Sequence, residues 1–274
     1  MTAVYTGSRR KQMNPYIKAN KEAWNLLAKD HYFEFKRRYQ TRDNLLSPDI
    51  IKELGDISDK TLIHLQCNTG SDTLSLARLG AKVSGVDLAP DNIVYANKLF
   101  EDFKTEGHFY EADLMEFGNH HQEKYDVVFT SEGAIGWLPD FDQWAKTIVQ
   151  LLNKDGFFYL YEIHPFFLMF DEDLFPKEEL DIRYPYFGRQ VDKSETIGGY
   201  AAEERIGESY YWMYSISDVV NALIKAGLKI EFIHEFDHLC YNAGNMNDIG
   251  VGSYEFKKWH GKMPLMFSIK ATLS

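Results

Sequence analysis

Hydrophobic positions predict a chain that begins with helices and then alternates strands and helices. Between Asn20 and Tyr39 apolar and aromatic residues recur at roughly helical spacing, and a short helix is predicted from Ser47, a suitable N-cap before Pro48. From there to Ile163, apolar runs typical of strands alternate with amphipathic segments typical of helices. The predicted strands are Thr61–Gln66, Lys82–Asp87, Phe109–Ala112, Tyr125–Ser131 and Gly156–Ile163, and the predicted helices are Ser71–Leu79, Pro90–Phe103 and Phe141–Leu152.

This alternation predicts an α/β fold with an open, mostly parallel sheet and helices on both faces. The regular spacing stops after Ile163, and residues 164–214 have no clear period but contain twelve aromatic residues. A helix at Ser217–Ala226 and strands at Lys229–Phe236 and Leu265–Thr272 follow, and the two strands, with no helix between them, are expected to pair antiparallel. We predict a flexible arm (1–19) and a single domain (20–274) with N-terminal helices (20–55) and an inserted cap (164–214).

Composition is that of a soluble globular protein. The chain has 274 residues, of which 45% are hydrophobic and 26% charged. It contains only two cysteines, Cys67 and Cys240, which exclude a disulfide framework and favour a reducing compartment. The first ten residues lack the apolar core of a signal peptide, and no apolar run approaches the ~20 residues that span a bilayer. A cytoplasmic location without membrane contact is expected.

The charge disfavours nucleic-acid binding, which depends on basic surfaces that neutralise phosphates. The formal net charge is −11. Residues 1–40 are the exception, with nine Lys or Arg against three Asp or Glu. A solvated helix face accounts for this basic stretch, although it keeps a nucleic-acid partner as an alternative.

The chemistry is expected at the carboxyl ends of the parallel strands, where open α/β sheets bind ligands. Four such ends carry suitable residues. The loop from His64 to Gly70 joins the first strand to its helix, and Asp87 closes the second strand, 17 residues after Gly70. Asp87 is expected to accept hydrogen bonds from the hydroxyls of a ribose. The other two ends carry Asp113 with Leu114, suited to an adenine, and Ser131 with Glu132.

Two adenosine cofactors compete for this arrangement. A dinucleotide needs a G-x-G-x-x-G run that presents backbone N–H groups to its pyrophosphate. The corresponding run here, Gln66-Cys-Asn-Thr-Gly-Ser, has one glycine and lacks that fingerprint. S-adenosylmethionine has no phosphate, so a loop with polar Gln66 and Asn68 and with Gly70 suits it better.

These motifs resemble class I S-adenosylmethionine-dependent methyltransferases, in particular a bacterial small-molecule-type subgroup with a His-Leu-Gln-Cys variant of the glycine-rich loop. The resemblance covers about residues 20–272 and is strongest in 60–166. It implies a Rossmann-like, doubly wound, seven-stranded sheet whose last strand is antiparallel, plus the aromatic-rich cap. The matching segments are Leu62–Ala81, Gly85–Pro90, Thr130–Asp140 and Tyr161–Phe166.

The resemblance also implies roles for single residues. The methionine end of the cofactor should lie on the loop that contains His64, Gln66, Asn68 and Gly70, and Ser131 should line the sulfonium side. Asp87 should hold the ribose, with Leu88 flanking the adenine and Asp113 and Leu114 contacting it. The sequence departs from the family at His64, where an acidic residue is usual, and at Gln66 and Asn68, where glycines are usual.

The sequence offers fewer candidates for catalytic residues than for cofactor-binding residues. Histidine is the simplest base near neutral pH, and His164, just after the fifth strand, is the best placed. A turn-forming role beside Pro165 competes with that interpretation. Glu132 is the second candidate, with Glu162 as a further alternative. No metal site is assigned, since His234 and His238 are four apart on a strand and lack a third ligand.

The predicted reaction is transfer of a methyl group from S-adenosylmethionine to an O or N of a small, hydrophobic or aromatic acceptor, with S-adenosylhomocysteine as product. The protein is expected as a monomer or homodimer. The alternatives are an RNA or protein methyltransferase, an S-adenosylmethionine-binding protein that transfers no methyl group, a non-enzymatic binding module and, more remotely, a nicotinamide dehydrogenase.

Overall fold

The computed structural model describes residues 13–199, 201–250 and 252–274. Helix α1 spans Pro15–Arg38. It begins five residues before the predicted start, because the Asn14 side chain accepts a hydrogen bond from the Tyr16 N–H and Pro15 occupies the first helical turn. Residues 15–19, assigned from the sequence to the flexible arm, are therefore helical, and the first twelve residues of that arm lie outside the described part.

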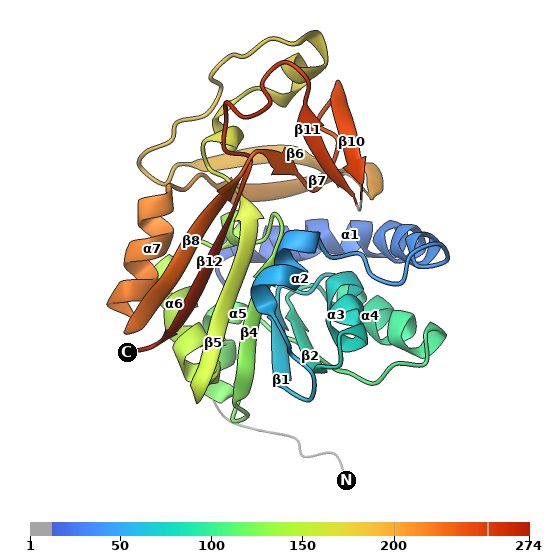
Figure 1. Ribbon diagram of the computed structural model, residues 1–274, viewed down its shortest axis with the longest axis vertical. Coiled ribbons are helices and arrows are strands. Elements are labelled where there is room, and N and C mark those ends of the chain that lie inside the picture. The colour runs from blue at the N-terminus through green and yellow to red at the C-terminus, as the bar shows by residue number, and fades with distance from the viewer. Residues whose placement is uncertain (1–12, 200, 251) are drawn as a thin grey trace.

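A seven-stranded sheet forms the centre of the molecule, in the order β3-β2-β1-β4-β5-β12-β8 (Figure 1). Only β12 runs antiparallel to its neighbours, β5 and β8. The predicted antiparallel pairing of the last two strands is thus confirmed, as is the Rossmann-like topology. The strands are β1 (Thr61–Leu65), β2 (Lys82–Asp87), β3 (His108–Glu111), β4 (Tyr125–Ser131), β5 (Leu152–Ile163), β8 (Leu228–Phe236) and β12 (Met266–Leu273).

Helices cover both faces of this sheet, as predicted (Figure 1). One layer consists of α2 (Pro48–Leu54), α3 (Ser71–Arg78) and α4 (Pro90–Asp102), and the other of α5 (Leu114–His120), α6 (Phe141–Leu151) and α7 (Ile216–Lys225). Helix α5 has no counterpart among the predicted elements. It is one of the shortest helices, and its Asn, Gly and His residues give it no apolar period.

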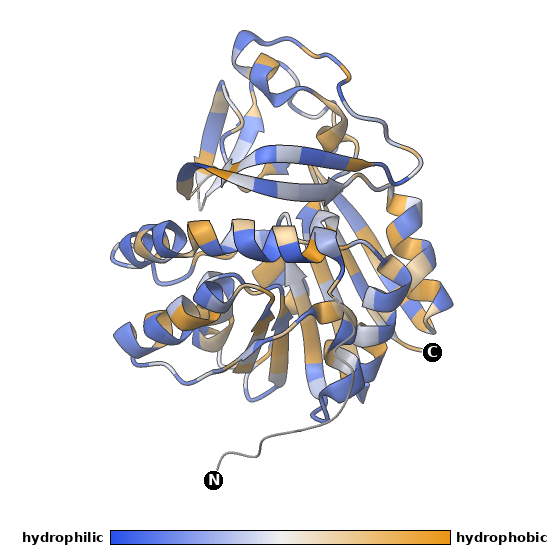
Figure 2. Ribbon diagram, turned by 180° about the vertical axis from the view of Figure 1, so that it is seen from behind, coloured by the Kyte–Doolittle hydropathy of each residue, from blue (hydrophilic) through white to orange (hydrophobic). Residues whose placement is uncertain are grey.

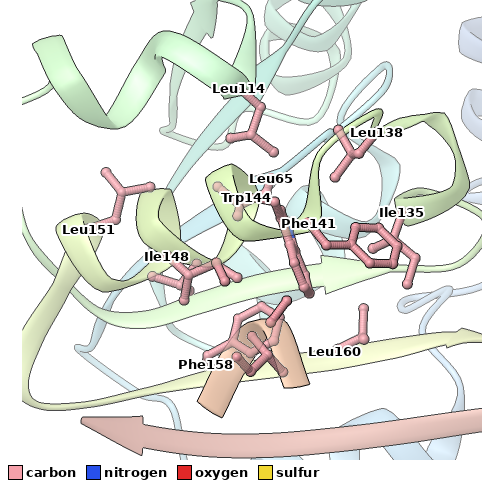
Figure 3. Close-up of a cluster of buried hydrophobic side chains, with 14 of the residues drawn as sticks. Leu65, Leu114, Ile135, Leu138, Phe141, Trp144, Ile148, Leu151, Phe158 and Leu160 are labelled. Carbon is pink, nitrogen blue, oxygen red and sulfur yellow. The ribbon is translucent and has the colours of Figure 1, made fainter. Parts of the chain in front are cut away.

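The hydrophobic core on the second layer centres on α6 (Figure 3). This helix places Phe141, Trp144, Ile148 and Leu151 toward the sheet at helical spacing. Trp144 is fully buried and meets the Phe158 ring of β5 edge-on, with 5.5 Å between ring centroids. Such packing fixes the sheet, and with it the strand ends that carry the candidate site.

The cap is built from two small sheets above the carboxyl ends of the strands (Figure 1). A long hairpin pairs β6 (Val191–Gly199) with β7 (Ala202–Trp212), and β9 (His238–Leu239), β10 (Met246–Gly250) and β11 (Ser253–Phe256) form a second sheet. Neither sheet was predicted, and β9–β11 lie outside the expected cap segment 164–214. The described residues also contain three short 3-10 turns, Ile135–Trp137, Phe167–Met169 and Glu172–Lys177.

Helix α1 lies between the sheet and the cap hairpin (Figures 1 and 2). The Asn20 side chain donates to the Tyr210 carbonyl of β7 at 2.8 Å and accepts from the Tyr210 N–H at 2.7 Å, so it extends the ladder of that strand. Arg205 of the hairpin pairs with Asp30 of α1 at 2.6 Å. The helix and the hairpin thus form one continuous roof over the sheet edge.

Several basic residues of α1 are paired with acidic ones. Lys21 contacts Glu111, Lys36 contacts Asp102, and Arg37 contacts Glu34. Within the described residues, no helix has both the length and the apolar character needed to cross a bilayer.

Candidate functional site

A cavity of about 1080 Å³ follows the carboxyl edge of the sheet, under the roof formed by α1 and the cap. Residues from the ends of five adjacent strands line it, in the spatial order β3, β2, β1, β4, β5. With neighbouring strands about 4.8 Å apart, this edge spans roughly 20 Å. The volume lies slightly above the usual range for ligand pockets and gives room for an adenosine cofactor and a second molecule.

The loop after β1 keeps the backbone shape of a glycine-rich turn without its glycines. Gln66, Asn68 and Gly70 all have positive φ angles, of 57°, 51° and 78°. Left-handed backbone costs roughly 1–2 kcal/mol at a non-glycine residue, so side-chain interactions must compensate. The Gln66 amide donates to the Ala134 carbonyl at 2.7 Å, and the Asn68 side-chain oxygen accepts from the Thr69 N–H at 2.6 Å.

Gly70 has a different structural role from Gln66 and Asn68. It does not line the cavity, and a Cβ added to it would lie 3.1 Å from the Ala96 Cβ of α4. Its left-handed conformation begins α3 at the place where that helix packs against α4. Gln66 and Asn68 do line the cavity, as expected from the sequence.

Asp87 lies at the end of β2 in the cavity wall, where the sequence predicts it. Its carboxylate accepts hydrogen bonds from the Asn68 N–H, the Ala89 N–H and the Asn92 side chain, each at 2.9 Å. Burial raises the pKa of Asp87, while these donors act in the opposite direction. The carboxylate is therefore fixed in one orientation at the cavity edge, with the β1 loop held against it.

The next two predicted contacts, His64 and Ser131, are linked to each other. His64 bonds Thr73 through Nδ1 at 2.9 Å and Ser131 through Nε2 at 3.2 Å, and the Ser131 hydroxyl donates to Asp72 at 2.7 Å. Burial lowers the pKa of His64 to about 3, so the ring is neutral near pH 7. Both residues line the cavity, but the His64 ring is occupied in tying β1 to α3 and β4.

Three residues that line the cavity each have a buried polar atom with no hydrogen-bond partner among the described residues. These atoms are Oε1 of Gln66, Oγ of Ser71 and Oδ1 of Asn92. Buried polar groups are nearly always satisfied, so these atoms fit a ligand that brings N–H or O–H donors. The α-ammonium and ribose hydroxyls of S-adenosylmethionine are such donors. A pyrophosphate brings none and would face the Asp72 and Asp87 carboxylates.

The residues predicted to contact adenine also lie in the cavity wall. Leu88, Asp113 and Leu114 line it from the ends of β2 and β3. Asp113 has an additional local task, because its carboxylate accepts from the Met115 N–H at 2.9 Å and caps α5. The position of Asp113 is compatible with both the cap and the predicted adenine contact.

Glu132 follows β4 and lines the cavity next to Ser131. Its φ angle is +26°, a conformation that only strong surrounding contacts can hold. Burial, followed by the nearby Asp72 carboxylate, raises the pKa of Glu132 to about 8. A carboxylate with this pKa is populated in both protonation states near neutral pH, which is what general acid–base catalysis requires.

His164 does not line the cavity, and this corrects its expected placement. Its Nε2 contacts Glu235 at 3.0 Å, and its Nδ1 accepts from the Phe166 N–H at 3.0 Å. Both ring nitrogens are therefore engaged in holding the turn after β5. The turn-forming alternative is the one that matches the geometry.

Several cavity residues were not predicted from the sequence. They come from α1, from α3, from the 3-10 turn Glu172–Lys177 and from the loop after β9, far apart in the chain. Asp72 was detectable in principle, since it follows Gly70 by two residues, whereas no local pattern marks the others. Among the unpredicted residues are Asn20, Arg38, Asp72, Glu172, Cys240 and Tyr241.

Trp137 and Trp24 line the cavity together, with their rings 5.1 Å apart at the centroids. Trp137 also meets Tyr211 of β7 edge-on. These aromatic rings form the wall between the sheet edge and the cap hairpin. In the described part of the chain, no three His, Cys, Asp or Glu side chains converge in a way that would hold a metal ion.

The central segment of the chain matches a known family. Residues 63–158 match the model described as "Methyltransferase domain". Over 89 residues the chain is 32% identical to a ubiquinone biosynthesis O-methyltransferase of Hydrogenovibrio crunogenus, an alignment that covers 32% of this chain and 37% of that protein. The chain thus aligns with well under half the length of this curated relative.

Solved structures extend the likeness to most of the fold. An S-adenosylmethionine-dependent methyltransferase from Mesorhizobium loti superposes with a TM-score of 0.55 at 18% identity, covering 82% of this chain and 95% of the other. The glycopeptide N-methyltransferase MtfA, solved with S-adenosylmethionine, gives 0.53 at 13% identity, covering 82% and 92%. Residues 63–158 thus match a methyltransferase domain, and the chain around them has the fold of class I S-adenosylmethionine-dependent methyltransferases.

Proposed function

We propose that the protein binds S-adenosylmethionine and transfers its methyl group to an oxygen or nitrogen of a small molecule. One observation carries this proposal: the cavity wall contains a fixed carboxylate, Asp87, together with Gln66, Ser71 and Asn92, each of which has a buried polar atom without a partner. The family of the central segment supports it.

In this proposal the half of the cavity at β3, β2 and β1 holds the cofactor. Asp87 accepts from the ribose, and Leu88 and Leu114 flank the adenine next to Asp113. Gln66 and Asn68 hold the amino-acid end, and Ser131 lines the sulfonium side. When bound, S-adenosylmethionine supplies an electrophilic methyl group on a positively charged sulfur.

The half at β4 and β5 holds the acceptor. Its wall contains Tyr161, Cys240 and Tyr241, and Glu132 follows β4, the strand of this half that lies next to β1. Glu132 accepts the proton that a hydroxyl or ammonium group loses when it becomes a nucleophile. Apart from this step, the chain contributes mainly by holding the acceptor close to the methyl group and excluding water.

The test is calorimetric titration with S-adenosylmethionine and S-adenosylhomocysteine, followed by assay of S-adenosylhomocysteine release with phenol, catechol and aromatic amine acceptors. Micromolar binding and acceptor-dependent release support the proposal. Binding of S-adenosylmethionine without S-adenosylhomocysteine release in the presence of any acceptor favours a cofactor-binding protein that does not methylate. Absence of binding by folded protein refutes the proposal.

A further inference from the structure

Glu162, next to the last residue of β5, is fully buried and uses its whole carboxylate to bind backbone N–H groups. Oε1 accepts from Gly133 and from Ile163, both at 2.6 Å. Oε2 accepts from Ala134 at 2.8 Å and from Ile135 at 3.0 Å. Three of the four donors are consecutive residues of the loop after β4.

This loop is an anion-binding nest occupied by the protein's own side chain. Gly133 has a φ angle of +77°, and Ala134 returns to right-handed backbone, so successive N–H groups converge on one point. Burial raises the pKa of Glu162, and the four N–H donors act in the opposite direction. They favour the ionised carboxylate, because a protonated oxygen would direct its O–H at another donor. With its acceptor positions filled, Glu162 is not available as the catalytic base.

The anchored loop carries two elements of the proposed site. Glu132, with its φ angle of +26°, directly precedes Gly133, whose N–H donates to Glu162. The Ala134 carbonyl accepts the Gln66 side chain, which stabilises the left-handed turn after β1. One carboxylate on β5 therefore connects the loops that follow β4 and β1.

We propose that Glu162 is the positioning residue of this site: its carboxylate fixes the loop that presents Glu132 and supports Gln66. This inference rests on the proposed function for its catalytic meaning. The geometry itself makes a claim that needs no turnover, namely that the environment of Glu132 depends on Glu162. A purely structural role would change stability but leave the titration of Glu132 where it is.

The test compares two variants by carboxyl ¹³C NMR of glutamate-labelled protein, with E132Q to identify the Glu132 signal. In E162Q the charge is lost and one oxygen is replaced by an amide that cannot accept, so the titration midpoint of Glu132 should fall by about one pH unit. In E162D the charge stays but the shorter side chain cannot reach all four donors. A change of the Glu132 midpoint in this variant therefore reports the loss of positioning and not the loss of charge. Glu195 is exposed, so E195Q serves as the matched control and should leave the midpoint unchanged.

A second measurement uses the wild-type protein and does not depend on either variant folding. The amide protons of Gly133, Ala134 and Ile135 should exchange with solvent far more slowly than those of other loops. Fast exchange at these amides refutes the proposal. So does an unchanged Glu132 midpoint in folded E162Q and E162D.

Binding of S-adenosylhomocysteine to the same proteins separates this inference from the proposed function. Weaker binding by E162Q than by wild type agrees with both. If wild type does not bind, the proposed function is wrong, whereas the NMR titration and amide exchange still decide whether Glu162 positions Glu132.

Discussion

The Asn68 N–H donates to Oδ2 of Asp87 at 2.9 Å, and this bond joins the left-handed turn after β1 to the end of β2. Through it, the residue proposed to hold the ribose also shapes the loop proposed to hold the methionine end. Cofactor affinity and local backbone order are thus coupled at one carboxylate.

Replacing that carboxylate should therefore affect both properties. Asp87→Ala leaves the Asn68 and Ala89 N–H groups unpaired, so we expect S-adenosylhomocysteine binding to weaken by about 1–3 kcal/mol. Calorimetry measures the affinity and urea denaturation the stability. Asp91→Ala, four residues later in the first turn of α4, is the matched control and should bind S-adenosylhomocysteine normally. Unchanged affinity in folded Asp87→Ala would remove Asp87 from the site.

The left-handed conformation of Gln66 predicts an unusual order of stabilities. Both Gln66→Ala and Gln66→Gly lose the bond to the Ala134 carbonyl, but only alanine keeps the cost of positive φ. The glycine variant should be more stable than the alanine variant by about 1 kcal/mol in urea unfolding. Lys146, which is exposed within α6, is the control position. There the alanine variant should be more stable than the glycine variant by a similar amount. Equal stabilities at Gln66 would contradict the strained turn.

The raised pKa of Glu132 predicts that stability falls as the pH rises. The ordinary carboxyl pKa is 4.5, and burial raises the pKa of Glu132 to about 8. Between these values the folded state keeps the proton that the unfolded chain releases, so the free energy of unfolding decreases with increasing pH.

Glu132→Gln cannot ionise and should escape this loss. Relative to wild type, the variant should gain at least about 1.4 kcal/mol between pH 5 and pH 8, the equivalent of one pKa unit. Urea denaturation across this pH range measures the difference in the free energy of unfolding. For the control variant Glu195→Gln, the free energy of unfolding should change with pH in the same way as for wild type. A constant gap between Glu132→Gln and wild type would show that Glu132 titrates normally.

Gly136 is predicted to be intolerant of any side chain. A Cβ at this position would overlap the ring of Tyr211, which lines the cavity from the cap hairpin. Gly136→Ala should cost about 1–3 kcal/mol and push the ring toward the cavity, which weakens S-adenosylhomocysteine binding. In a Tyr211→Leu background the same change should cost less, because the clashing ring is gone. If Gly136→Ala costs the same in both backgrounds, the Tyr211 ring is not the source of the strain.

Local patterns were sufficient to predict the central sheet. Each of its strands is a short apolar run bounded by turn residues, and each early helix has a cap or an apolar face, as Pro90 and Gly80 illustrate. The site residues at strand ends, Asp87 and Glu132, followed from the topology, because parallel strands place their carboxyl ends on one edge.

The cap was not predictable in the same way. Its hairpin strands carry exposed charged residues such as Lys193 and Glu204, and their main partner is α1 rather than the sheet. Cys240 and Tyr241 enter the cavity from a segment with no periodic signal. His164 was misplaced because a histidine after a strand has the same sequence appearance whether its ring faces a cavity or closes a turn.

The pairing of Asn20 with Tyr210, 190 positions later, has a consequence for synthesis of the chain. At 5–20 residues per second, a ribosome needs roughly 10–40 s to pass from one to the other. During this interval α1, which precedes every other described element, has no β7 to pack against. The roof of the cavity is therefore completed only after most of the sheet has been translated, and nascent chains arrested before residue 202 should be unable to retain ligand.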